Sequence, residues 1–196
     1  DTFVNWLAYE KREHPAVGVL WDAVMDHPGL AGVAPLLARA YEAIAESLVA
    51  GGTLYLCGNG GSHSDALHIS GELLKAFALP RPVSPELAER LMAQPDGDEL
   101  VQHLQTGLRT HVLGTNTALT TAVANDIPVS DIGYAQELYA LARPGDVLLG
   151  ISTSGRARNV RLAAQVAAAM GLTTLALTGR APNPLADMVD VALAVP

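Results

Sequence analysis

The sequence contains very few of the residues that several common classes of protein need. It has one cysteine, Cys57, so it can form no internal disulfide and no multi-cysteine metal site, which fits a reducing compartment. Only 12 Lys and Arg stand against 20 Asp and Glu, and the formal net charge of -8 argues against nucleic-acid and anionic-membrane surfaces. No apolar run approaches the roughly 18 to 20 residues that cross a bilayer. We therefore expect a cytoplasmic protein whose partners are small molecules or proteins.

The first fifty residues show helical periodicity. Apolar side chains recur every three or four positions between Val33 and Leu48, which predicts a long amphipathic helix. Shorter helices are expected around Trp6 and Trp21. Since this extension has little core of its own, we expect residues 1–50 to pack on the following domain or on another subunit.

From Gly51 onward, short apolar runs alternate with helical stretches. The predicted strands are 53–57, 109–113, 147–151, 173–178 and 189–195, and the predicted helices are 62–77, 117–124, 133–142, 159–170 and 184–188. Strands separated by helices predict a doubly wound α/β fold with a five-stranded parallel sheet. A stretch rich in proline and acidic residues at about 78–106, with one short helix at 85–93, is expected to be an insertion, either a surface excursion or a lid over a site.

Two turns at strand ends have the composition of an anion site. Asn59, Gly60, Gly61 and Ser62 follow the first strand, and Ser152, Thr153, Ser154 and Gly155 follow the third. Ligands of open parallel sheets bind beyond the carboxyl ends of the strands, where bare backbone N–H groups and helix N-termini favour anions. Neither turn has a Walker lysine or GxGxxG spacing, so we expect no nucleotide cofactor and favour a metabolite phosphate. Arg156 and Arg158 either add a phosphate contact or form a solvated first turn.

The helix that follows the first turn is unusually polar. His68 and Glu72 are one turn apart on one face, and Leu67 and Leu74 are expected on the opposite, core-directed side. The pair fits an acid/base couple or two ligands of one metal, which would need a third ligand; the alternative is a surface pair worth a few tenths of a kcal/mol.

Three further features have simpler explanations. Asn125 and Asp126 end a helical stretch, where they either reach the same rim or cap a turn. His103 and His111 are expected to be structural. Cys57 is expected to be a buried core thiol rather than a nucleophile.

Taken together, the motifs resemble a known family. CGNGGSHSDALHISGELL, TAVANDI, RPGDVLLGISTSG, LTTLALTG and DVALAVP occur in this order and resemble SIS-type sugar-phosphate isomerase domains, specifically the phosphoheptose isomerases, over about 51–196 apart from the insertion. The resemblance implies a flavodoxin-like SIS fold. It also implies a cytoplasmic homotetramer that converts sedoheptulose 7-phosphate to a heptose 7-phosphate through an enediol, for activated heptose biosynthesis.

The resemblance also implies residue roles. Ser62, Ser152 and Ser154 would hold the phosphate, Asn59 and Asp126 would contact the sugar, and Thr153 would line the site. Gly60, Gly61, Asn125 and Arg156 complete the expected substrate-binding set. Glu72 would be the acid/base group beside His68, and in members that carry zinc the pair His68 and Glu72 would be ligands.

Two departures from the family pattern keep alternatives open. Where the family continues STSGNS, this chain has Arg156 and Ala157, so one hydroxyl contact is lost and a guanidinium replaces it. The family's final helix, with a Gln and a His that complete the site, has no counterpart in this sequence. We expect residues to be missing at either end, this helix among them; the other interpretation is a protein that cannot turn over. The alternatives are a non-catalytic SIS regulator that binds proteins, and an isomerase or sensor for another sugar phosphate.

Overall fold

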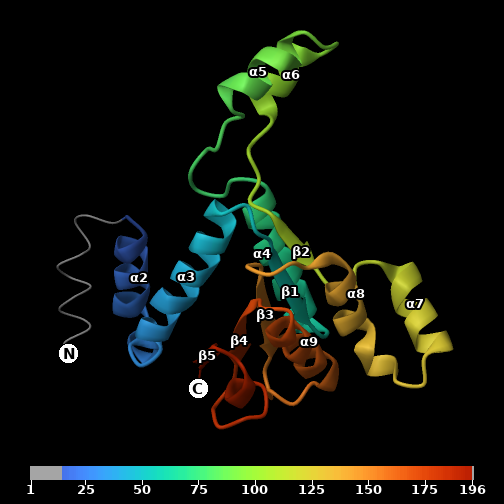
Figure 1. Cartoon of the computed structure of the whole chain (residues 1–196). Helices are drawn as coiled ribbons and strands as arrows, with labels where there is room; N and C mark the ends of the chain where they lie inside the picture. The colour runs from blue at the N-terminus through green and yellow to red at the C-terminus, as the bar shows by residue number, and fades with distance from the viewer. Residues whose placement is uncertain (1–14, 196) are drawn as a thin grey trace.

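The computed structural model describes residues 15–195 (Figure 1). The helix predicted around Trp6 lies outside this range. Along the chain the helices are α2 (Pro15–Asp26), α3 (Ala34–Val49), α4 (Gly61–Leu74), α5 (Pro85–Met92), α6 (Gly97–His103), α7 (Thr117–Asp126), α8 (Gly133–Leu141) and α9 (Arg158–Ala169). Short 3-10 turns are η1 (Pro28–Leu30), η2 (Ser130–Ile132) and η3 (Ala186–Met188), and the strands are β1 (Leu54–Gly58), β2 (Thr110–Val112), β3 (Val147–Ser152), β4 (Thr173–Thr178) and β5 (Val191–Ala194).

The five strands form one parallel sheet in the order β2-β1-β3-β4-β5, which confirms the predicted doubly wound fold. This is the flavodoxin-like order, and its direction reverses between β1 and β3. Gly58 at the end of β1 lies opposite Ile151 near the end of β3. The turns that follow these two strands therefore start side by side, at the edge where ligands of such sheets bind.

The sheet has an apolar layer on each face because its strand side chains alternate. Leu54 and Leu56 belong to a buried cluster with residues of α3 and α4, whereas Tyr55 and Cys57 belong to a cluster with α8 and α9. Cys57 is fully buried, and burial raises the pKa of its thiol to about 12. The prediction of a core thiol is confirmed.

Helix α3 packs on the sheet of its own chain, which is one of the two alternatives for the extension; packing of residues 1–50 on another subunit stays a prediction. Helix α3 contacts β1, β3 and β5, and the Ser47 hydroxyl donates a hydrogen bond to the Gly145 carbonyl at 2.7 Å. Its outer face and that of α2 still expose Val19, Met25 and Tyr41. No helix among residues 15–195 is long and apolar enough to cross a membrane.

Two sequence predictions about helices are wrong. The core-facing stripe of α4 is Ala66, Ile69, Ser70 and Leu73, so Leu67 and Leu74 are one position out of phase and about half exposed. The helix predicted at 184–188 is only the turn η3. There the Asn183 side-chain oxygen accepts a hydrogen bond from the Ala186 N–H at 3.0 Å, so the segment folds into a local turn.

The insertion forms an arm, residues 75–109, that stands away from the sheet at the C-terminal end of α4 (Figure 1). Its base is closed by an antiparallel bridge between Pro82 and Gln105 and by Arg81, whose guanidinium donates to the carbonyls of Leu73 and Thr106. The predicted helix at 85–93 is confirmed as α5, but α6 was not predicted. Phe77, on the arm, is 82% exposed.

Candidate functional site

The turn after β1 brings α4 directly against the strand end. A β-carbon on residue 58 would lie 2.8 Å from backbone atoms of Ser62, which is too close for a real contact. Only glycine at position 58 therefore allows α4 to approach the strand end this closely. Gly60 has φ 55 and precedes the first residue of α4. Asn59, Gly60 and Gly61 are exposed and Ser62 is half-buried, so the helix N-terminus and a hydroxyl face the carboxyl edge of the sheet together. This is the geometry of an anion-binding turn.

The turn after β3 is fixed by the segment that follows β4. Gly155 has φ 63, and a β-carbon on it would lie 1.8 Å from the Asn183 side-chain oxygen. The Thr153 and Gly155 carbonyls accept hydrogen bonds from the N–H groups of Gly179 and Leu185. Ser152 is buried, whereas Thr153 and Ser154 are exposed. The second turn is thus rigidly placed, with two of its hydroxyls open to a ligand.

An amide pair joins the first turn to the start of α9, the helix that follows the second turn. Asn59 donates to the Asn159 side-chain oxygen at 2.9 Å and accepts from the Asn159 amide at 2.8 Å. The Tyr134 hydroxyl, from α8, donates to the Gly58 carbonyl and lies 3.3 Å from the same Asn59 oxygen. The expectation that the two turns lie together is confirmed. Sequence reasoning missed Tyr134 and Asn159 as members of this site, and no periodicity or motif spacing would have paired positions 100 residues apart.

The two arginines of the second turn differ in their surroundings. Arg158 is paired with Asp131 in η2, with an N–O distance of 3.0 Å. The Arg156 backbone N–H donates to the Ser154 hydroxyl at 3.2 Å, and its exposed guanidinium has no ion-pair partner within the described range 15–195. Arg156 is therefore the arginine that is available to an anion.

Asn125 and Asp126 form the last residues of α7, and both are exposed. The Asn125 amide donates to the Asp126 carboxylate at 2.7 Å. Helix α7 packs on η2, which the Arg158–Asp131 pair ties to the start of α9. Among residues 15–195 no side-chain hydrogen bond or ion pair joins Asn125 or Asp126 to either turn, so their contact with a sugar stays a prediction.

The two other histidines singled out in the sequence have different outcomes. His111 on β2 shares a hydrogen bond with the buried Glu137 at 2.9 Å, and Glu137 also accepts from the Gly114 N–H. The pair anchors the edge strand to α8, which confirms a structural role for His111. His103 is an exposed residue at the end of α6.

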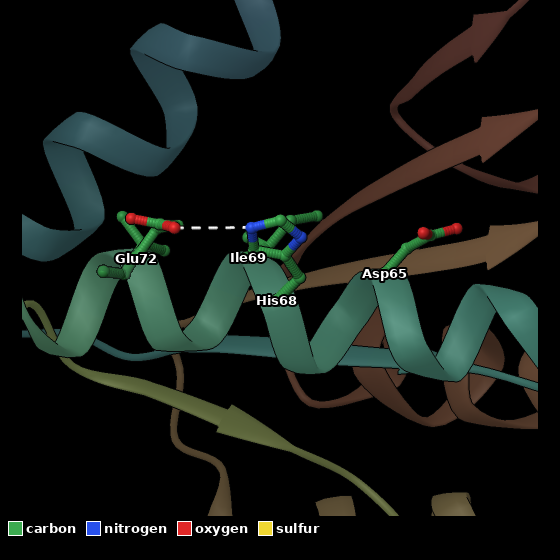
Figure 2. Close-up of a pocket in the computed structure, with 5 residues that line it drawn as sticks. Asp65, His68, Ile69 and Glu72 are labelled. Carbon is green, nitrogen blue, oxygen red and sulfur yellow. Dashed lines mark ion pairs between the residues drawn. The ribbon is translucent and has the colours of Figure 1, made fainter. Parts of the chain in front are cut away.

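His68 and Glu72 are brought together on α4 as predicted (Figure 2). Their Nε2 and Oε1 atoms are 3.3 Å apart, and the side chains are 78% and 42% exposed. With Asp65, Ile69 and Leu73 they line an open depression of about 370 Å³. Glu72 follows Ser62 by ten residues, about 15 Å along the helix axis, and helical side chains lean toward the N-terminus. A ligand that contacts both must therefore be long.

A zinc site is incomplete within the described residues. An imidazole and a carboxylate suit zinc, but catalytic zinc sites keep three protein ligands. Within residues 15–195 no group of three His, Cys, Asp or Glu side chains lies close enough to hold a metal. Zinc binding by His68 and Glu72 stays a prediction, and it would need at least one further ligand.

The fold and the paired turns define a sugar-phosphate-binding class of α/β domain, and comparison with known proteins agrees. The sequence model of the SIS domain matches residues 32–104 and 99–179. The phosphoheptose isomerase of Shewanella sediminis is 36% identical over 163 residues, which cover 82% of this chain and 70% of that protein. The phosphoheptose isomerase of Thermodesulfovibrio yellowstonii is 38% identical over 161 residues, which cover 82% of this chain and 68% of that protein. The chain belongs to the phosphoheptose isomerase family of SIS domain proteins.

Solved structures support the same assignment. Phosphoheptose isomerase from Neisseria gonorrhoeae superposes with a TM-score of 0.67 at 29% identity, covering 94% of this chain and 85% of that one. The Francisella tularensis phosphoheptose isomerase gives 0.69 at 26% identity, covering 93% and 85%. The resemblance inferred from the motifs is therefore confirmed.

Proposed function

We propose that this chain is an aldose–ketose isomerase that converts sedoheptulose 7-phosphate into a heptose 7-phosphate for activated heptose biosynthesis. The observation that carries the proposal is the pair of anion turns at adjacent strand ends, held in place by the two hydrogen bonds between Asn59 and Asn159, with His68 and Glu72 further along the helix that leaves the first turn. Family membership supports the same activity.

The phosphate would be held at the two turns. Ser62 and Ser154 offer hydroxyl donors, Gly60 and Gly61 offer backbone at the N-terminus of α4, and Arg156 offers a charged donor. Hydrogen bonds to a charged acceptor are about twice as strong as neutral ones. A phosphate on the last carbon of a seven-carbon chain places the first carbons away from the turns, in the direction of Glu72.

Glu72 would carry the proton. Its carboxylate takes a proton from C1 of the ketose while protonated His68 gives a proton to the C2 carbonyl oxygen, so that the C1–C2 double bond forms and the enediol results. The O1 hydroxyl then gives its proton to His68, C1 becomes the aldehyde carbon, and C2 receives the proton that Glu72 holds. His68 lies beside Glu72 and also orients it, and both side chains end in the protonation state in which they began.

We also propose that the protein works as a homotetramer. Enediol chemistry needs water to be excluded, yet His68 and Glu72 are exposed in the single chain. Apolar Leu67 and Leu74 flank them on α4, and α2 and α3 expose Val19 and Tyr41. Subunit contacts over these helices would cover the depression. In a zinc-bound form, neutral His68 and Glu72 would be two of the ligands and the zinc would polarise the sugar oxygen in place of protonated His68. The remaining ligands would come from outside the described residues.

The proposal is tested by incubating the protein with sedoheptulose 7-phosphate and following the product by NMR, with and without a chelator. We expect an aldoheptose 7-phosphate to form. Loss of turnover with the chelator and recovery with Zn²⁺ would establish the metal. Binding of the sugar phosphate without turnover would favour the non-catalytic regulator, and conversion only of a pentose or hexose phosphate would favour the other isomerase.

A further inference from the structure

The contacts around Asn59 use nearly all of its hydrogen-bonding capacity. An amide side chain has one oxygen acceptor with two lone pairs and two N–H donors. The Asn59 oxygen faces the Asn159 amide at 2.8 Å and the Tyr134 hydroxyl at 3.3 Å, and one of its N–H groups donates to Asn159. A single N–H group of Asn59 is left for a ligand. The side chain predicted to contact the sugar is mainly a link between protein segments.

Three segments from different parts of the chain meet at this link. Asn59 belongs to the turn after β1, Tyr134 to the first turn of α8, and Asn159 to the first turn of α9. The Asn159 oxygen also accepts from the Val160 N–H at 3.0 Å, which fixes its side chain at the start of the helix. Tyr134 is half-buried and its ring lies against Gly114, so its hydroxyl has little freedom to move.

The protonation state of Tyr134 suits a permanent donor. Burial, with smaller contributions from Cys57 and Glu137, raises the pKa of the Tyr134 phenol above its ordinary value of 10.0. The hydroxyl therefore keeps its proton at every pH at which the enzyme would be assayed. The Gly58 carbonyl and Asn59 always face a donor.

We propose that Asn159 and Tyr134 are positioning residues that hold the turn after β1 against the start of α9 and so keep the two anion turns at the separation a phosphoryl group needs. Asn159 acts through Asn59, and Tyr134 acts through the Gly58 carbonyl and Asn59. The inference rests on the proposed function for the identity of the substrate. A phosphoryl group bridges the Ser62 turn and the Ser154 turn only if their spacing is kept. Within residues 15–195, the Asn59–Asn159 pair joins the first turn to the start of α9, the helix that follows the second turn.

The first experiment compares steady-state constants for sedoheptulose 7-phosphate. Asn159→Ala should raise KM about tenfold and Tyr134→Phe about threefold, with kcat within about twofold of the unaltered protein, because binding and not proton transfer is affected. Matched controls are Gln165→Ala, exposed on α9, and Tyr139→Phe, exposed on α8. Both should leave KM unchanged. A purely structural role would lower the thermal midpoint and the active fraction but leave KM alone, and that result would overturn the inference.

The second experiment asks whether Asn159 acts through Asn59. In an Asn59→Ala background, adding Asn159→Ala should change KM less than about twofold, because the shared link is already lost. Tyr134→Phe should keep part of its effect there, because the Tyr134 hydroxyl also donates to the Gly58 carbonyl. Effects of Asn59→Ala and Asn159→Ala that multiply independently would show that Asn59 is not the route and would overturn this part of the inference.

The same variants separate this inference from the proposed function. Calorimetric titration with sedoheptulose 7-phosphate measures Kd whether or not turnover occurs. If the unaltered protein binds the sugar phosphate but does not isomerise it, the proposed function fails, and a roughly tenfold weaker Kd of Asn159→Ala still supports positioning. If turnover is observed and neither KM nor Kd changes in Asn159→Ala, the proposed function stands and the inference fails.

Discussion

The two ends of helix α4 present opposite kinds of surface. At its start, Ser62 and the glycine turn are packed against β1 and linked to the start of α9 by the Asn59–Asn159 bonds. Further along, His68 and Glu72 contact each other on an open face. The proposed anion site is held by hydrogen bonds within one chain, whereas the proposed acid/base pair is exposed and, among residues 15–195, has no third metal-ligating side chain beside it. We therefore expect binding and catalysis to be separable by substitution.

The largest effect is expected from removing the base. Glu72→Gln should lower kcat by about 10² to 10⁴-fold, the range for a lost general base, and leave Kd for the sugar phosphate within about tenfold, because the anion turns are untouched. Measuring kcat by NMR and Kd by calorimetry checks both halves. Glu89→Gln, exposed on α5, is the matched control and should behave as the unaltered protein. Full activity of Glu72→Gln would remove Glu72 from the mechanism.

The next largest effect is expected from a substitution that disturbs the backbone of the turn after β3, which forms one side of the proposed anion site. Gly155→Ala should lower the free energy of unfolding by at least about 2 kcal/mol, since its φ of 63 is strained for alanine and the new β-carbon would meet the Asn183 side chain at 1.8 Å. Gly133→Ala is the matched control. Gly133 has helical φ and ψ at the start of α8, and no atom lies within 4 Å of the position that an added β-carbon would take, so we expect it to stabilise by about 0.4 to 1 kcal/mol. Urea unfolding followed by circular dichroism measures both free energies of unfolding. An unchanged free energy of unfolding for Gly155→Ala would contradict the conclusion that the turn after β3 is fixed by close packing of Gly155 against Asn183.

The sequence predicted the features that depend on residues close together in the chain, and it missed contacts between residues far apart in the chain. Apolar runs predicted every strand of the sheet to within a few residues, since burial on both faces requires them. The glycine and hydroxyl turns were predicted because strand ends in such sheets share one edge. The α6 helix was missed although acidic Asp98 and Glu99 in its first turn and His103 in its last were a readable signal.

Other features left no readable signal. The amide pair depends on side-chain orientations at positions 100 residues apart, which no local pattern encodes. The core-facing stripe of α4 was misplaced for a related reason. Small Ala66 and Ser70 pack inward while Leu67 points out, so hydrophobicity alone gave the wrong phase. The exposed face of α4 that carries His68 and Glu72 thus also exposes Leu67 and Leu74. These exposed leucines support the subunit contact that we propose over this helix.

The smallest effect separates the two arginines beside the second turn. Arg158 is paired with Asp131 at the surface, with both side chains about half exposed, and such pairs contribute roughly 0 to 1 kcal/mol. Arg158→Gln should therefore lower the free energy of unfolding by less than about 1 kcal/mol and change KM less than about twofold. Arg156 has no such partner among the residues described, so Arg156→Gln should raise KM for the sugar phosphate about three- to tenfold and weaken its dependence on salt. KM measured at low and at high ionic strength checks the pair. Equal effects of the two substitutions would mean that the guanidinium of Arg156 does not replace the hydroxyl that Ala157 lacks.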